Sequence, residues 1–235
     1  MYNGLIHFHS NNSYDSILKI KSIVNFALKN KLNFLALTDH DTISGSEKLK
    51  DYIDKNNINI EIIIGAEYLT EYGDIVVLNI DTEIQNRTFT EFINEVKLKK
   101  GVLFLPHPYV GHKNIELLAQ SVDFIEVFNS RVTEENNDRA FQLAKKYSKP
   151  FYYASDAHTK KDLKNAIMKF EKRGDLVASL NRANITYKKL FKTTNFEVIF
   201  SQFVKAIKNK NIILFINLCK SFIVLLLKGK LFKPI

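Results

Sequence analysis

The chain has 235 residues, of which 46% are hydrophobic and 25% are charged, and these values are typical of a folded domain rather than a disordered chain. The single cysteine, Cys219, excludes an internal disulfide and a cysteine-rich zinc module. Met1 to Ser10 lack the features of a secretory signal, so we expect a cytoplasmic protein.

The net charge of +9 divides into −4 over residues 1–158 (17 basic, 21 acidic) and +13 over residues 159–235 (17 basic, 4 acidic). This division argues against a uniformly basic surface for nucleic acid.

Short apolar runs alternate with helical patterns through the first two thirds of the chain. The apolar runs predict strands at residues 5–9, 34–38, 60–67, 75–80, 102–105, 124–128, 151–154 and 166–170. Apolar residues at helical spacing predict helices at residues 17–31, 45–55, 88–100, 115–120, 134–147 and 175–180. Strands separated by helices indicate an α/β fold with a mostly parallel sheet, and about seven strands in one run suit a barrel better than an open sheet.

Five of the six histidines lie at or just beyond a predicted strand, and acidic residues accompany them. In a barrel of parallel strands, the carboxyl ends of the strands meet at one face, so these side chains would converge. One histidine in such a place would more simply be a hydrogen-bonded structural residue, but five at equivalent positions favour a metal site. Imidazole and carboxylate together bind zinc, manganese or iron. The polar residues at the strand ends are His7, His9, Asp39, His40, Asp41, Glu67, His107, Glu126, Asp156 and His158.

Five short motifs, in this order, resemble those of the PHP (polymerase and histidinol phosphatase) superfamily. They are H-x-H-S at 7–10 with Asp15 shortly after, L-T-D-H-D-T at 37–42, G-A-E at 65–67, L-P-H-P at 105–108 and S-D-A-H at 155–158. The resemblance implies a distorted (β/α)7 TIM-like barrel and metal-dependent phosphoester hydrolysis, with two or three divalent metal ions at the carboxyl-terminal mouth. It also implies the ligands, namely His7, His9, Glu67 and Asp156 for the first metal, Glu67 and His107 for the second, and Asp15, His40 and His158 for the third.

The sequence departs from the family pattern at one ligand. Many members carry a further histidine on the strand after the glutamate, and residues 74–79 contain none. The second metal site is therefore weak, completed by water, or absent, unless His112 substitutes. The alternative for His112 is an exposed loop residue.

The mechanism expected at such a site uses a metal-bridging hydroxide as the nucleophile, because bound metal lowers the pKa of water and neutralises the phosphoester. Asp39 and Asp41 are candidates to orient a ligand imidazole and to shuttle protons, although Asp41 could equally cap the loop before Gly45. Arg131 is a candidate clamp for substrate phosphate, with a surface ion pair as its alternative. We expect Glu126 to lie behind the metal ligands and to support one of them.

The carboxyl-terminal part differs from the rest, and we divide the chain into a PHP domain at 1–195 and a helical extension at 196–235. Residues 212–227 are mostly apolar, but they are fewer than the about 20 needed to span a bilayer. Lysines precede and follow this segment, as in helices that lie on anionic membranes. We therefore expect residues 205–233 to make a peripheral contact with the inner face of the membrane, or to mediate self-association.

The function expected is that of a phosphoric ester hydrolase, either a phosphatase or a phosphodiesterase. Its substrate would be a small phosphorylated metabolite or a phosphorylated polymer or protein. One alternative is a 5′-3′ exoribonuclease, which the mildly acidic front part of the chain disfavours. Another is a non-catalytic PHP scaffold tethered by its tail, which is disfavoured because only one expected ligand is missing.

Overall fold

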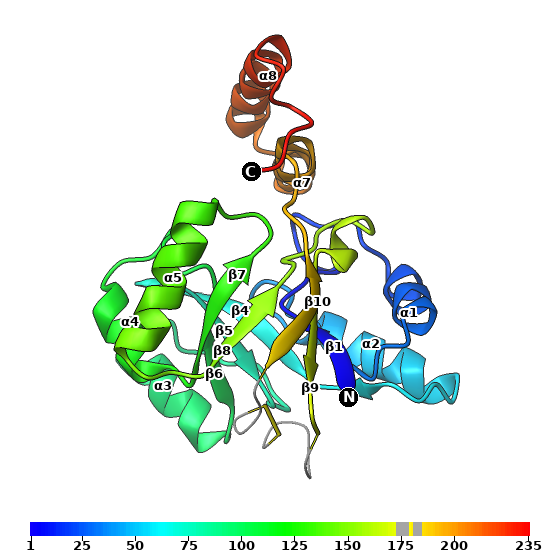
Figure 1. Cartoon of the computed structure of the whole chain (residues 1–235), viewed down its shortest axis with the longest axis vertical. Helices are drawn as coiled ribbons and strands as arrows, with labels where there is room; N and C mark the ends of the chain where they lie inside the picture. Colours follow the sequence, from blue (N-terminus) through cyan, green and yellow to red (C-terminus); the bar gives the residue numbers. More distant parts are fainter. Residues whose placement is uncertain (173–178, 181–184) are drawn as a thin grey trace.

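The computed structural model describes residues 1–172, 179–180 and 185–235, and its strands form two five-stranded sheets (Figure 1). The first sheet has the order β10-β9-β1-β2-β3, with β1 (Tyr2–Ile6), β2 (Phe34–Ala36), β3 (Glu61–Ile62), β9 (Ala166–Phe170) and β10 (Thr186–Leu190). The second has the order β4-β5-β6-β7-β8, with β4 (Gly65–Thr70), β5 (Gly73–Leu78), β6 (Val102–Leu105), β7 (Phe124–Asn129) and β8 (Phe151–Ala154). The predicted helix at 175–180 lies mostly outside the described residues.

The prediction of a mostly parallel sheet is only half right, because each sheet has two parallel and two antiparallel pairings; β9 runs antiparallel to both β1 and β10. Strands β1, β2 and β3 are parallel to one another, and so are β6, β7 and β8. Strand β5 runs antiparallel to both of its neighbours, because a two-residue turn joins it to β4. Among the described strands we find two open sheets rather than one closed sheet, so the seven-stranded barrel is not confirmed and the fold is mixed α/β. Single parallel bridges, Phe8 to Ala157 and His40 to Glu67, connect the two sheets.

Side chains alternate between the two faces of each strand, so each sheet has an outer face that must also be covered. The helices cover these outer faces. Helices α1 (Ile20–Lys29) and α2 (Ser44–Lys55) pack on the first sheet, and α3 (Phe89–Leu98), α4 (Ile115–Ser121) and α5 (Glu134–Lys146) pack on the second (Figure 1). The inner faces meet in a third apolar cluster, where Phe104 stacks on Phe124 at a centroid distance of 4.6 Å and meets Tyr152 edge-on. Burial of each such ring stabilises the fold by about 1.5–3 kcal/mol.

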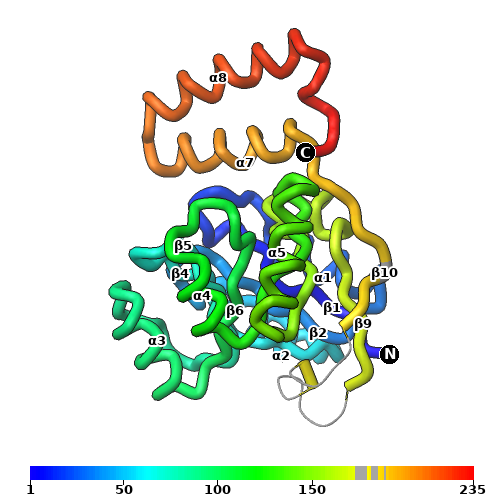
Figure 2. Tube along the Cα trace, turned by 60° about the vertical axis from the view of Figure 1, so that its left-hand side comes forward, coloured from blue at the N-terminus to red at the C-terminus, as the bar shows by residue number. Residues whose placement is uncertain are grey.

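Two further helices, α7 (Asn195–Lys208) and α8 (Ile212–Leu227), form a hairpin on one side of this body (Figure 2). Helix α7 begins with a capping box between Thr194 and Glu197, which satisfies free backbone N–H groups of its first turn. The chain then returns after α8, so that the N–H of Phe196 donates to the carbonyl of Leu231. Helix α7 lies between the body and α8, and α8 is the outermost layer (Figure 2).

Candidate metal centre

The predicted ligands come together where the chain leaves its strands. His7 and His9 follow β1, His40 follows β2, His107 follows β6, and Asp156 and His158 follow β8. Glu67 lies within β4 between Ala66 and Tyr68, which face the outer core, so its own side chain faces inward. The backbone turns sharply at His7, His107 and Asp156, whose φ angles are 60°, 28° and 47°. Positive φ is uncommon outside glycine, and Asp and His are among the residues that adopt it most readily.

The first group of predicted ligands surrounds the carboxylate of Glu67. His9 Nε2 lies 3.3 Å from both Glu67 Oε2 and Asp156 Oδ1, and His7 Nε2 lies 3.4 Å from Glu67 Oε1. Both Nε2 atoms are buried and have no hydrogen-bond partner among the described residues. A buried polar atom without a partner is costly, and two that face the same carboxylates form a donor set that fits a shared cation.

The second group is built around Asp15, which the loop after β1 brings back to the site. Asp15 Oδ2 lies 3.1 Å from His158 Nε2 and 3.2 Å from His40 Nε2. With His9, these three residues can offer ligand atoms that all lie within 4.8 Å of one another. His107 joins the opposite side, with its Nε2 3.1 Å from Glu67 Oε1, so the carboxylate of Glu67 lies between the groups.

Contacts behind the cluster fix the orientation of the imidazoles. His7 Nδ1 donates to Glu126 Oε1 at 2.8 Å, and His158 Nδ1 donates to the carbonyl of Asp156 at 2.8 Å. In both residues an oxygen holds the proton on Nδ1, so that Nε2, which faces the cluster, is the nitrogen available to bind a metal. Glu126 also accepts the backbone N–H of His107 at 2.6 Å, so it supports two predicted ligands at once. This arrangement is typical of histidines that bind metal.

Asp74 is a candidate ligand that the sequence analysis missed. Its carboxylate forms a group with His40 and Glu67 whose ligand atoms lie within 4.8 Å of one another. We looked for ligands at the carboxyl ends of parallel strands, but β5 is antiparallel, so its amino-terminal end reaches the mouth. The turn residues Gly73 and Asp74, which separate two apolar runs, were the available signal for a hairpin. Asp74 therefore lies on the strand where the family pattern has the missing histidine.

His112, which we considered as a substitute ligand, is not brought into the cluster. Its Nε2 lies 2.8 Å from the carbonyl of Asp74 and its Nδ1 lies 2.9 Å from the carbonyl of Val110. Gly73 packs so closely on this imidazole that an added Cβ would lie 2.5 Å from it. His112 thus fixes the loop after β6 against the start of β5 and does not replace the missing histidine.

The electrostatics of the cluster couple imidazoles to carboxylates. Burial lowers the pKa of His40 and His107, but the charge of Glu67 outweighs it, and the pKa of each rises to about 9. Burial would raise the pKa of Glu67, but His7 and His40 hold it well below its usual range. Burial and the charge of Glu67 raise the pKa of Asp74 to about 6. Ionised Glu67 is therefore paired with protonated His40 and His107, and a bound divalent cation would replace those protons.

The three predicted catalytic residues lie in different surroundings. Asp39 is buried and accepts the backbone N–H and the hydroxyl of Ser10, so its carboxylate fixes the loop after β1. Asp41 lies at the surface, where its carboxylate is 3.4 Å from Arg87 Nε.

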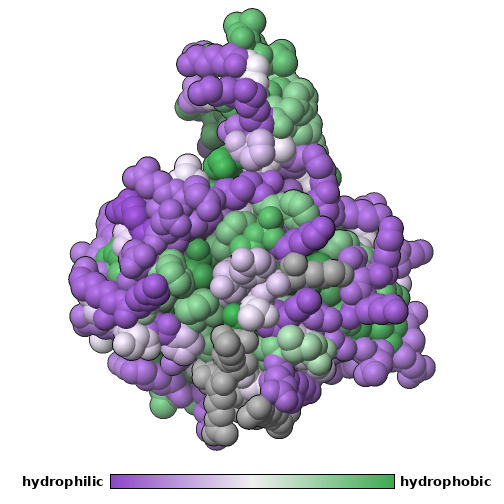
Figure 3. All heavy atoms as spheres, viewed as in Figure 1, coloured by the Kyte–Doolittle hydropathy of each residue, from purple (hydrophilic) through white to green (hydrophobic). Residues whose placement is uncertain are grey.

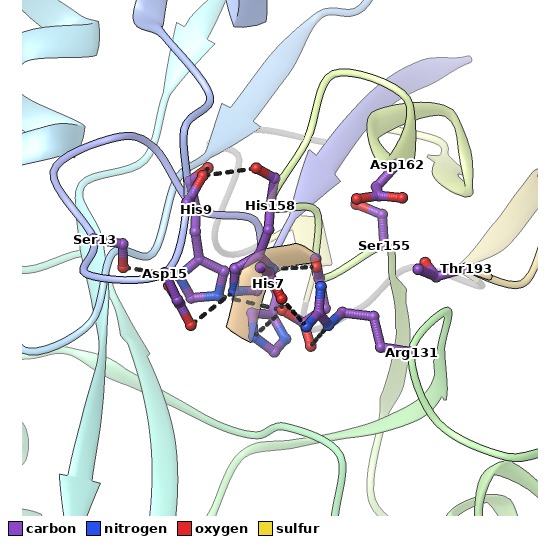
Figure 4. Close-up of polar contacts among 12 residues, drawn as sticks. His7, His9, Ser13, Asp15, Arg131, Ser155, His158, Asp162 and Thr193 are labelled. Carbon is purple, nitrogen blue, oxygen red and sulfur yellow. Dashed lines mark hydrogen bonds and ion pairs between the residues drawn. The ribbon is translucent and has the colours of Figure 1, made fainter. Parts of the chain in front are cut away.

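Arg131 lies beside the cluster. Its side chain points toward the histidines (Figure 4). Its Nε is 3.6 Å from Asp156 Oδ2, and its Nη2 donates to Ser201 of α7. Its Nη1 is buried and has no hydrogen-bond partner among the described residues. The roles of Asp39, Asp41 and Arg131 in catalysis stay predictions.

Comparison with known proteins agrees with this geometry. The sequence profile of the PHP domain matches residues 6–218, so the chain belongs to the PHP-domain family. The match extends past residue 195, where we predicted the domain to end. An uncharacterised protein of Methanocaldococcus jannaschii (MJ1587) is 29% identical over 136 residues, which cover 55% of this chain and 77% of that protein.

Two solved structures share the fold. One is a two-domain protein from Bacteroides vulgatus containing a predicted PHP-like metal-dependent phosphoesterase. It has a TM-score of 0.67 at 17% identity, covering 80% of this chain and 65% of that chain. The chain therefore spans less than two thirds of that protein. The other is PsfC from Pseudomonas syringae, with a TM-score of 0.62 at 17% identity, covering 89% of this chain and 96% of that chain.

Proposed function

We propose that this protein is a metal-dependent phosphoester hydrolase. The observation that carries the proposal is the pair of buried, partnerless Nε2 atoms of His7 and His9, which face the carboxylates of Glu67 and Asp156. Carboxylates and imidazoles can satisfy one another by hydrogen bonds, but these two imidazole nitrogens do not do so. A cation between them would satisfy all four groups.

The ligand groups support two or three divalent ions of zinc, manganese or iron. We assign His7, His9, Glu67 and Asp156 to one ion, and Asp15, His40 and His158 to another. A third ion would take Glu67 and His107, which group with His7, and Asp74 would add a ligand on the other side of Glu67, where it groups with His40. When bound, the ions would neutralise the phosphoester and lower the pKa of bound water.

The chain's own residues would position the substrate. Arg131 is anchored between Asp156 and α7, and its free Nη1 can donate to a phosphate oxygen. Glu126 would hold His7 in the tautomer that binds metal. A small phosphorylated metabolite or a phosphorylated polymer or protein remains the substrate class that we propose. The single cysteine favours a reducing compartment, so we propose a cytoplasmic location.

Hydrolysis of two chromogenic esters tests the proposal. Purified full-length protein is assayed with p-nitrophenyl phosphate and with bis(p-nitrophenyl) phosphate, with and without added manganese. We expect metal-dependent hydrolysis that Asp156→Asn abolishes and that Asp81→Asn, at an exposed position, leaves intact. Preference for the monoester would indicate a phosphatase, and preference for the diester would indicate a phosphodiesterase. If the metal-loaded protein hydrolyses neither ester, the proposal is wrong and a scaffold role becomes the better account.

A further inference from the structure

Helix α8 exposes an unusual amount of apolar surface. Within this helix, which the structure describes throughout, Leu218 is the one buried residue. The exposed large hydrophobic residues of α8 are Ile212, Ile213, Phe215, Ile216, Ile223, Val224, Leu226 and Leu227. Figure 3 shows hydrophobic side chains along one side of the projecting hairpin and hydrophilic ones along the other. A contiguous apolar patch on the surface of a protein indicates a docking site.

The charge of the same segment identifies the kind of surface that it fits. Residues 198–235 contain seven lysines and no acidic residue. Three lysines precede α8, one lies within it and three follow it, namely Lys205, Lys208, Lys210, Lys220, Lys228, Lys230 and Lys233. Two copies of this segment would repel each other, whereas an anionic lipid surface is complementary to it. No helix among the described residues is long and apolar enough to cross a bilayer.

The hairpin is fixed to the loops that carry the metal centre. Lys208 Nζ donates to the backbone carbonyls of Asn11, Ser13 and Ser16, which lie in the loop that contains Asp15. Ser201 of α7 accepts a hydrogen bond from Arg131 at 2.7 Å. These contacts hold α7 against the loops of the centre. Helix α8 lies beyond α7 as the outer layer (Figure 2).

We propose that α8 docks the protein on an anionic membrane. The helix lies in the plane of the membrane interface with its apolar side chains inserted among the acyl chains. Lys210 before the helix and Lys228, Lys230 and Lys233 after it contact the lipid headgroups, whereas Lys208 stays bound to the body. Because α7 is anchored beside Asp15 and Arg131, docking holds the metal centre close to the membrane surface. This inference goes beyond the proposed hydrolysis and does not depend on it.

Vesicle flotation of the full-length protein tests this proposal. We expect the protein to float with phosphatidylcholine vesicles that contain phosphatidylglycerol, and more weakly with phosphatidylcholine alone. Ile223→Glu together with Leu227→Glu should reduce binding about 100-fold or more, because both side chains are exposed and available for insertion. Leu98→Glu is the matched control, since this residue is 84% exposed on α3 and should not affect binding.

The contribution of charge is tested separately. Lys228→Gln together with Lys230→Gln should weaken binding to anionic vesicles about 25-fold, at about fivefold per lysine. Lys50→Gln together with Lys55→Gln, on the exposed face of α2, should leave binding unchanged. Circular dichroism checks that each variant is folded.

Light scattering after gel filtration, without lipid, tests for a second copy. We expect a monomer. A dimer that Ile223→Glu with Leu227→Glu dissociates, together with no flotation on anionic vesicles, would overturn the membrane proposal in favour of self-association. A monomer that fails to float would overturn it as well. Hydrolysis of soluble esters is measured in parallel, so a failure of the membrane proposal is distinguished from a failure of the proposed activity.

Discussion

The substitution Glu126→Gln tests whether the hydrogen bonds of Glu126 orient the predicted metal ligands. In the structure, the two carboxylate oxygens of Glu126 accept three N–H groups, from His7 Nδ1 at 2.8 Å, His107 N at 2.6 Å and Asn129 Nδ2 at 2.9 Å. Glutamine keeps the shape but replaces one oxygen with a donor, so at least one of these N–H groups loses its acceptor. Loss of a hydrogen bond to a charged group costs about 1.5–3 kcal/mol.

This cost corresponds to a metal affinity about 10- to 100-fold lower, which is the range found when residues that hydrogen-bond a metal-binding histidine are removed. Competition with a chromogenic chelator measures the affinity. Glu116→Gln is the control, because the Glu116 carboxylate pairs with Lys146 at the surface. If Glu126→Gln binds metal as tightly as the unaltered protein, Glu126 does not orient His7, and our account of the contacts behind the cluster is refuted.

Three further predictions follow from the same geometry. Asp74→Ala should lower the metal content or weaken one metal site about tenfold, whereas the control Asp81→Ala should change neither. Plasma mass spectrometry of the dialysed proteins measures the metal that each variant retains. The pKa of His40 and His107 is about 9, so each holds a proton below pH 9 that a metal must displace. Because the two residues hold different ions, the affinity of each of these sites should rise about tenfold per pH unit below pH 9 and level off above it; calorimetry that finds no proton release would contradict this. Phe104→Ala should destabilise the fold by about 3–5 kcal/mol in urea unfolding, and a loss below about 1 kcal/mol would show that the inner core is not tightly packed.

The positions of the predicted ligands follow directly from the sequence. Each of His7, His40, His107 and Asp156 comes at or directly after a short apolar run, and the end of such a run is also the end of a buried strand. The carboxyl ends of the parallel strands β1 and β2, and of β6, β7 and β8, meet at one edge, which brings residues far apart in the chain together. The inward position of Glu67 follows from simple alternation along β4.

The sequence could not determine how the sheets pair at long range. Periodicity predicts strands but not their partners, and the two isolated bridges at His40 and Phe8 are set by tertiary packing. Asp74 was missed for the same reason, because its place at the mouth depends on the direction of β5. The helix predicted at residues 212–227 is confirmed as α8, yet its apolar pattern alone did not show that most of its side chains would be exposed.

Metal content tests the central claim most directly. Glu67 is the appropriate residue to change, because its carboxylate lies within 3.4 Å of imidazole nitrogens of His7, His9, His40 and His107. Full-length protein and Glu67→Gln are loaded with manganese or zinc, dialysed and measured by plasma mass spectrometry. We predict two or three equivalents of metal in the unaltered protein and at least one equivalent fewer in Glu67→Gln. A folded, unaltered protein that retains no metal after loading would contradict the account.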